Sequence, residues 1–194
     1  MKTLLITTAI LASALVPAAA SAQAVPGAIV AVVDLDKVTG DCNACRTAAS
    51  TLKSQVTALQ NRQKALAGPI ETEGKSLKAA VDALKGQDPD AALQTRIRAF
   101  QAKEQSASEE LQKQQQQIQR NQQYIQKQIV DKLGPIYQSV MQKRGANIMV
   151  EVGTTLAAST SVDVTADVLA GLNAALPSLS TTAPAEAAQA PQGR

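Results

Sequence analysis

The chain has 194 residues, of which 19 are Lys or Arg and 16 are Asp or Glu, and its formal net charge is +3. It contains no His, so it lacks the residue that proteins use most often as a general base and as a metal ligand. Aromatic residues make up 2% of the chain and much of its 45% hydrophobic content is Ala, a composition that disfavours a large globular core and favours long helices.

The first 22 residues are typical of a secretory signal peptide. Lys2 precedes an apolar run from Leu4 to Val16, and small residues continue to Ala22, after which cleavage is expected. A membrane helix would need roughly 20 apolar residues, and Pro17 interrupts this run too early. No later segment is long or apolar enough to span a membrane. We therefore expect a soluble exported chain, located in a bacterial periplasm.

The next element is a predicted strand, because residues Ile29 to Val33 form a β-branched run. Cys42 and Cys45 follow with the spacing of a thiol redox centre, at the start of a long helix that Asp41 is placed to cap.

Three roles for this cysteine pair can be compared. A thioredoxin-like centre would need an α/β domain with aromatic residues nearby, which this sequence does not offer. A zinc site would be half filled, unless subunits combined their thiolates. We favour a structural role, either a short-range disulfide or two small buried side chains, and no metal site.

Residues 46–144 have the apolar periodicity of two long amphipathic helices. In the break between them, Gly86 can end the first helix, Asp88 can cap the second, Pro89 suits its first position, and Asp90 complements its dipole. We therefore expect an antiparallel hairpin.

The tip of this hairpin is expected at about residues 86–89. Polar residues interrupt both apolar seams, so the arms should pack loosely. Kinks are expected at Gly68–Pro69 and Gly134–Pro135, because proline removes an amide donor and clashes with the preceding turn.

The second arm contains the glutamine-rich run LQKQQQQIQRNQQYIQKQIV. The favoured interpretation is a solvated helix surface, since Gln is a good helix former. The alternative is a hydrophilic, weakly binding wall for an unfolded client protein.

Charge is distributed unevenly along the chain. Residues 46–144 carry 16 Lys or Arg against nine Asp or Glu, whereas the remainder after residue 22 has two basic residues against seven acidic ones. This asymmetry indicates a basic working segment on an acidic support.

The second arm is followed by another mixed segment. Strands are predicted near 147–152 and 154–158, and then a short helix with Thr165 as its cap, Asp167 in its first turn, and inward-facing Val168, Leu169 and Leu172.

Residues 23–45 and 145–176 would together form one small body of only about 55 residues, so we expect it to oligomerise. The oligomerisation residues predicted in its strands are Ile29, Val30, Val32, Val33, Ile148, Val150 and Val152. The Pro/Ala-rich tail, 177–194, is expected to be disordered.

The segments AVVDLDKV, GPIY, ANIMVEVG and SVDVTADVLAGLN, placed around a long polar hairpin, resemble the Skp/OmpH family of periplasmic chaperones over residues 28–176. The resemblance implies a mainly helical α+β fold and a homotrimer with a shared barrel-like core. Three hairpins would then surround a cavity that holds unfolded outer-membrane β-barrel proteins without ATP. It implies no cofactor and supplies no role for the cysteine pair.

If the resemblance holds, the basic arms would attract such a client at long range, and scattered apolar side chains would then make weak contacts. The cations nominated for this role are Arg62, Lys64, Lys75, Lys78, Arg96, Arg98 and Lys103. The apolar residues nominated are Leu77, Leu84, Leu93, Ile97 and Phe100. The favoured alternative for each apolar residue is packing between the two arms.

Other functions and partners are also weighed. A passive coiled-coil scaffold of the envelope is the main alternative to a chaperone, and a thiol redox protein is a weaker one. Weak contact with anionic membrane or lipopolysaccharide surfaces is a further option. No nucleic-acid partner is expected, because the basic residues lack interleaved aromatic side chains.

Overall fold

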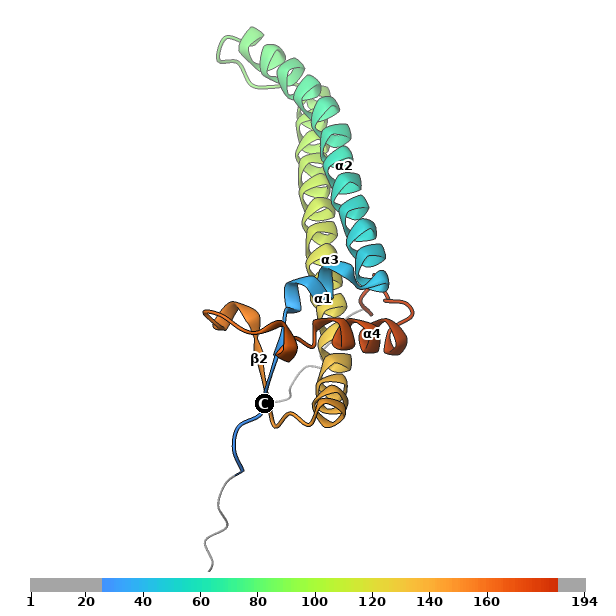
Figure 1. Ribbon diagram of the computed structural model, residues 1–194. Coiled ribbons are helices and arrows are strands. Elements are labelled where there is room, and N and C mark those ends of the chain that lie inside the picture. The colour runs from blue at the N-terminus through green and yellow to red at the C-terminus, as the bar shows by residue number, and fades with distance from the viewer. Residues whose placement is uncertain (1–25, 185–194) are drawn as a thin grey trace, which may run out of the picture.

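A two-helix arm rises from a small body in the computed structural model (Figure 1), which describes residues 26–184. Eight elements follow in order: β1 (Val30–Val33), α1 (Leu35–Asp41), α2 (Asn43–Ala83), α3 (Ala91–Arg144), β2 (Ile148–Glu151), the 3-10 turns η1 (Val152–Thr154) and η2 (Thr160–Val162), and α4 (Thr165–Ala175). The predicted mainly helical α+β fold is confirmed. The predicted signal peptide lies outside the described residues.

The arm is the antiparallel pair α2 and α3. The chain reverses over residues 84–90, where Lys85 and Gly86 have φ angles of 47° and 92°. Asp90, rather than the predicted Asp88, caps α3, because its Oδ1 accepts from the Leu93 amide at 2.8 Å. Within residues 26–184, no helix is long and apolar enough to cross a membrane.

The prolines at which kinks were predicted do not interrupt either helix. Pro69 lies inside α2 and Pro135 lies inside α3, and each helix continues on both sides. Proline removes only one N–H donor from a long ladder, and packing between neighbouring helices can hold the flanking turns together. Figure 1 shows a gentle curve of the arm towards its tip.

The body is built around a parallel pair of strands from opposite ends of the chain. Val30 pairs with Ile148 and Val33 with Glu151, and Val32 also bridges to Asp163. The strand predicted at 154–158 is wrong. The Thr154 and Thr155 hydroxyls donate to the Glu151 carbonyl at 2.8 and 3.0 Å, so local bonds replace a sheet ladder there.

The core of the body lies where α1 and α4 meet the roots of α2 and α3. Val38, Cys42, Val168 and Leu172 are fully buried in it. Helix α1 was not predicted; it begins after Asp34, whose Oδ1 accepts from the Lys37 amide at 2.8 Å. Its seven residues were too short to show helical periodicity.

The start of α4 also differs in detail from the prediction. Its cap residue is Val164, and the predicted cap Thr165 is the first helical residue. The Thr165 hydroxyl instead accepts from the Asp34 amide at 2.9 Å and joins α4 to the end of β1. Val168 and Leu172 face inward as expected, and Leu169 packs against the core while half-buried.

Cys42 and Cys45 form a disulfide, and both residues are buried. Cys42 caps α2, since its Sγ accepts from the Cys45 amide at 3.2 Å. Asp41 does not cap this helix, because it is the last residue of α1. Both structural roles predicted for the pair are therefore present at once: the cysteines are bonded to each other and are buried.

Disorder was predicted for residues 177–194. Residues 185–194 lie outside the described residues, and the C-terminal segment 177–184 differs from the prediction. Leu179 packs against the core, and Ser180 to Ala183 lie along the arm, bonded to side chains of α2 and α3. The composition of the segment indicated disorder, but its bonds to the arm use main-chain groups, which composition does not report.

Candidate functional site

The arm buries the nominated apolar residues fully or in part. Leu77 is only 6% exposed, and Leu84, Leu93, Ile97 and Phe100 are half-buried. The Phe100 ring covers Gly74 so closely that a Cβ on Gly74 would lie 3.2 Å from it. The alternative interpretation, packing between the arms, therefore describes Leu77 and Phe100.

A shallow cleft of about 350 Å³ remains beside this contact, lined in part by Leu77, Val81, Ile97 and Phe100. Val81 is 42% exposed and was not nominated from the sequence. The periodic apolar pattern includes Val81, but it gives no means of telling which seam residues stay open to solvent.

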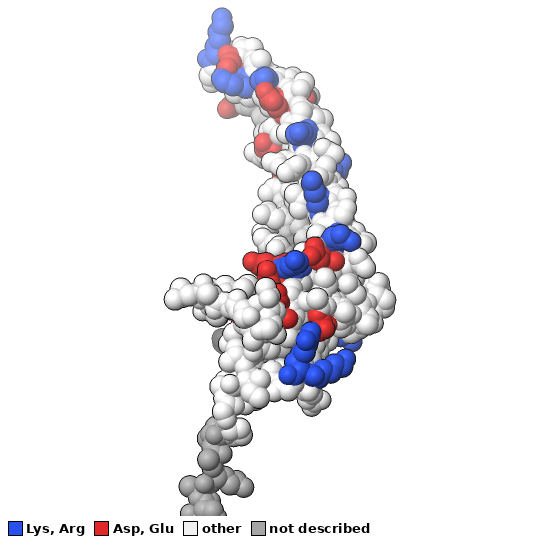
Figure 2. Space-filling model, in the orientation of Figure 1, with Lys and Arg blue, Asp and Glu red and all other residues white. Residues whose placement is uncertain are grey.

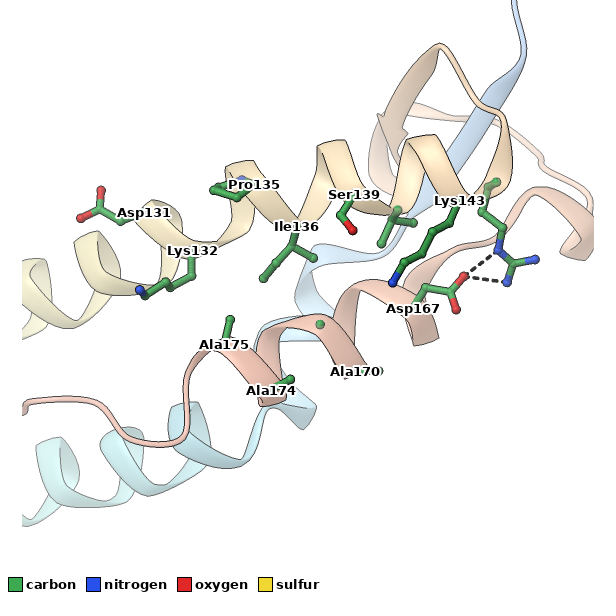
Figure 3. A pocket seen from close by; sticks show the side chains of 13 residues that line it. Asp131, Lys132, Pro135, Ile136, Ser139, Lys143, Asp167, Ala170, Ala174 and Ala175 are labelled. Atoms are coloured by element: carbon green, nitrogen blue, oxygen red, sulfur yellow. Dashed lines mark hydrogen bonds and ion pairs between the residues drawn. The ribbon is translucent and has the colours of Figure 1, made fainter.

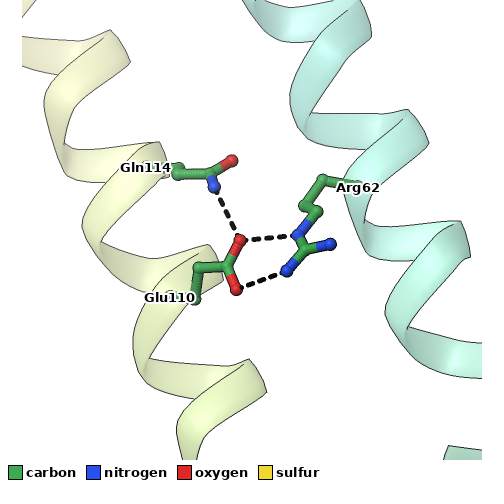
Figure 4. A network of polar contacts seen from close by, with 3 residues as sticks. All are labelled: Arg62, Glu110 and Gln114. Carbon is green, nitrogen blue, oxygen red and sulfur yellow. Dashed lines mark hydrogen bonds and ion pairs between the residues drawn. The ribbon is translucent and has the colours of Figure 1, made fainter.

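Two of the seven nominated cations tie the helices of the arm to each other. The Arg62 guanidinium binds the Glu110 carboxylate through two bonds of 2.6 and 2.9 Å, and Gln114 donates to the same carboxylate at 2.9 Å (Figure 4). The hydrogen bond from Arg62 lowers the pKa of Glu110 below its ordinary value, and Glu110 raises that of Arg62. Nearer the tip, Arg96 binds Glu73 at 2.8 Å.

Two further nominated cations form ion pairs along α2. Lys75 lies 2.6 Å from Glu71, and Lys78 lies 2.8 Å from Asp82. The hydrogen bond from Lys78 to Asp82 raises the pKa of Lys78. These pairs are solvent-exposed, so each contributes only modestly to the stability of the helix.

The remaining three nominated cations, Lys64, Arg98 and Lys103, are exposed and form no ion pair within residues 26–184. Figure 2 shows Lys and Arg spread over the visible face of the arm up to its tip, with carboxylates beside them near the tip and a further group of carboxylates where the arm meets the body. The arm therefore presents cationic groups that are free to contact an anion.

A larger cavity of about 940 Å³ lies at the base, between α3 and α4, and no sequence pattern predicted it (Figure 3). Ile136 and the small residues Ala170 and Ala174 line it, and Lys132 and Lys143 stand at its edge. Arg144 closes one end by donating to Asp167 at 2.7 Å. Small residues permit this close approach: a Cβ on Gly171 would lie 2.9 Å from Ile136 Cγ2.

The nominated oligomerisation residues divide into two groups. Val32 and Val33 are buried within the chain, at 4% and 3% exposure, and Val150 is half-buried. The rest are exposed: Ile29 by 56%, Val30 by 38%, Ile148 by 42% and Val152 by 39%. The two-stranded sheet thus keeps an apolar margin that this single chain does not cover.

The described residues hold no group of three or more Cys, Asp or Glu placed to bind a metal ion. The buried disulfide lies in the root of the arm, many turns of helix away from Lys64, Arg98 and Lys103. The arrangement can therefore bind anionic and apolar groups over an extended surface, and we assign no reacting side chain to it.

Comparison with known proteins agrees with this geometry. The family profile "Outer membrane protein (OmpH-like)" matches residues 29–172. A crystal structure from Caulobacter crescentus, of a protein described as a candidate outer membrane chaperone (OmpH-like), superposes with a TM-score of 0.65 at 21% identity. The match covers 81% of this chain and 89% of that one. No curated protein matches the chain.

The family match spans both strands of the body, the whole arm and most of α4, which are the segments that carried the resemblance in the sequence. The chain therefore belongs to the OmpH-like family.

Proposed function

We propose that this protein is an ATP-independent holdase chaperone of the periplasm, which binds unfolded outer-membrane β-barrel proteins and prevents their aggregation before membrane insertion. The observation that carries the proposal is the long, net-basic helical arm with exposed, unpaired cations, mounted on a small body with an uncovered apolar sheet margin. The proposal assigns no catalytic role to the chain.

The body supports self-association. A two-stranded sheet is marginally stable on its own, and exposed β-branched residues along it favour burial against further copies. Ile29, Val30, Ile148 and Val152 supply such a surface. A homotrimer, as the family resemblance implies, would place three arms around one cavity.

The arms supply long-range attraction. An unfolded outer-membrane protein exposes alternating apolar residues and often carries negative charge, and its unpaired strand edges promote aggregation. Cations such as Lys64, Arg98 and Lys103 would draw it in, and this attraction should weaken as salt screens it.

The short-range contacts are weak, which permits release without an energy source. The cleft near the tip is shallow, and Leu77 and Phe100 are engaged with the opposite helix. A client would therefore find scattered partial contacts such as Val81 rather than one deep pocket. Many weak contacts exchange quickly and accept different sequences.

The test is to dilute a denatured outer-membrane β-barrel protein into buffer without ATP, with and without the chain lacking residues 1–22. Light scattering follows aggregation and native mass measurement follows the complex. We expect suppressed scattering, a complex of three chains with one client, and weaker suppression at high salt. Unchanged scattering would overturn the proposal and favour a passive envelope scaffold.

The same preparation tests the weaker redox alternative. Cys42 is fully buried and serves as the cap of α2, so the disulfide is poorly placed for exchange with a substrate thiol. We expect no catalysed reduction of a protein disulfide.

A further inference from the structure

The C-terminal segment is bound to the arm almost entirely through its own main chain. Gln128 Nε2 donates to the Ser180 carbonyl at 2.9 Å, while its Oε1 accepts from the Ser180 amide at 3.1 Å. The Ala183 amide donates to Asn121 Oδ1 at 2.8 Å, and Gln55 Nε2 donates to the Thr181 carbonyl at 3.2 Å. These contacts use no side chain of the segment.

Four amide side chains from the two helices form this site, which we call the amide cluster: Gln55 of α2, and Gln117, Asn121 and Gln128 of α3. A primary amide carries a donor and an acceptor side by side, so it can pair with the N–H and C=O of one peptide residue as a neighbouring strand would. The pairing between Gln128 and Ser180 has this form. Such a site can bind polypeptide main chain with little dependence on the sequence.

The side chains of the amide cluster are also bonded to one another. Asn121 is only 3% exposed, and it donates to Gln55 Oε1 at 2.9 Å and accepts from Gln117 Nε2 at 2.8 Å. Arg120 donates to Gln117 Oε1, which leaves the Gln117 Nε2 amino group directed to Asn121 and the Ala183 carbonyl. Buried polar groups need partners, so this network fixes the amides in place.

One buried hydrogen-bond donor beside the cluster is unsatisfied. Arg120 Nε has no hydrogen-bond partner among the described residues. A buried donor without an acceptor is unfavourable, and it indicates that residues 177–184 do not satisfy every group around the cluster. A longer or differently placed peptide could offer the missing carbonyl.

The bound segment is itself suited to be displaced. Its sequence, PSLSTTAP, has no charged residue and is bounded by a proline at each end. Only Leu179 packs against the core. The segment is held because it belongs to the same chain, which gives it a high effective concentration, rather than by an extensive interface.

We propose that the amide cluster is a binding site for polypeptide main chain at the root of the arm, and that residues 177–184 occupy it in cis as a displaceable substitute for client. This inference rests on the proposed function and deepens it: an unfolded client would be bound there through its backbone, in competition with the protein's own C-terminal segment.

The experiment releases the segment without changing the arm. In the full chain lacking residues 1–22, Ser180→Pro with Ala183→Pro removes the two amide donors to the cluster. The matched control, Ser180→Ala, removes a hydroxyl that bonds only within the segment, to the Thr182 carbonyl. A dye-labelled synthetic peptide of sequence PSLSTTAP is the probe, with binding followed by fluorescence anisotropy. Circular dichroism and thermal melting verify that each variant folds.

The variant with both proline substitutions, which we call the released variant, should bind the peptide at least about tenfold more tightly than the unchanged chain. The reason is that the competing segment of the same chain no longer occupies the site. The control should match the unchanged chain. Adding Gln128→Ala to the released variant should abolish the gain, and so should N-methylation of the peptide at the positions of Ser180 and Ala183. Equal binding by all variants, or unimpaired binding of the methylated peptide, would overturn the inference.

A scattering assay on the same variants separates this inference from the proposed function. If the released variant gains peptide affinity but no variant suppresses aggregation of a β-barrel client, the site stands and the holdase proposal fails. If the unchanged chain suppresses aggregation and release brings no gain in peptide affinity, the holdase proposal stands and the competing segment is refuted.

Discussion

The root and the outer half of the arm are built differently, although the same two helices form both. At the root, α1 and α4 pack against the arm, Cys42 is fully buried, and Asn173 of α4 accepts from the Asn43 amide at 2.9 Å. Beyond Ala48, Leu77 is the one buried residue of α2. In α3, five of the six buried residues lie from Asn121 onward, towards the root.

Beyond the root, the arm buries few residues, Leu77 and Ala107 among them, and two ion pairs join its helices, Arg62 with Glu110 and Arg96 with Glu73. Exposed ion pairs contribute little to stability and are screened by salt, whereas burial of apolar surface contributes more and is not screened by salt. A helical pair built this way is anchored firmly at one end and can adapt along the rest of its length. That division suits a protein that must accept unfolded chains of different sizes.

The largest expected effect separates the two regions by stability. Leu172→Ala should lower the free energy of unfolding by about 2–5 kcal/mol, because it opens a cavity in the fully buried core. The matched change near the tip, Leu84→Ala, should lower it by about 1 kcal/mol or less, since Leu84 is half-buried. Urea denaturation measures both. Equal losses would show that the tip is packed as firmly as the root.

The disulfide should matter next, and only at the root. Replacing Cys42 and Cys45 together by Ala should lower the free energy of unfolding by about 2 kcal/mol, because a three-residue separation closes a small loop. Hydrogen exchange should then accelerate in the first turns of α2 and remain unchanged near the tip. Faster exchange at the tip would contradict the independence of the two regions.

The third expected effect concerns client affinity and distinguishes unpaired from paired cations. Arg98→Gln with Lys103→Gln should weaken client binding about 3- to 10-fold at low salt, because these cations are free to contact a carboxylate. The control, Lys75→Gln with Lys78→Gln, removes the same charge from cations that already hold carboxylates. It should have the smaller effect in a titration followed by fluorescence. A larger effect of the control would refute the distinction.

The smallest expected effect is a pH dependence of the middle of the arm. Arg62 lowers the pKa of Glu110 in the folded protein, so the contribution of this carboxylate to stability is present above its unfolded pKa and is lost as the pH falls through the lowered folded value. Glu110→Gln should therefore melt at a lower temperature than the unchanged chain near pH 7. The difference should shrink below about pH 4. A difference that is constant with pH would assign the stabilisation to packing.

The apolar periodicity and the Gly, Asp and Pro residues of the break were sufficient to predict the arm. Repeated three- and four-residue apolar spacings gave both helices, Lys85–Gly86 lies in the turn as the break indicated, and the inward residues Val168 and Leu172 of α4 were named correctly. These features are local, so a single sequence reports them.

The missed features depend on partners that are distant in sequence or on main-chain bonds. Helix α1 is too short for periodicity, and the threonines after Glu151 have strand propensity but bond locally instead. The glutamine-rich run did contain three of the four amides that bind the C-terminal segment, as the less favoured interpretation of a weakly binding wall allowed. Composition could not show that this wall would bind residues 177–184.

The parallel pairing of β1 with β2 has a consequence for the order of folding. Ile29 and Asn147, which are bonded beside these strands, are 118 residues apart, so β1 is made long before its partner. The arm contains mainly local contacts, and helical hairpins form quickly because closing short loops is entropically easy. We expect the arm to fold first and to bring its two ends together. Strands β1 and β2 are then close in space, so their pairing costs little further loop-closure entropy. Until then the β-branched first strand lies exposed, and the chain is in the same condition as the proteins it is proposed to protect.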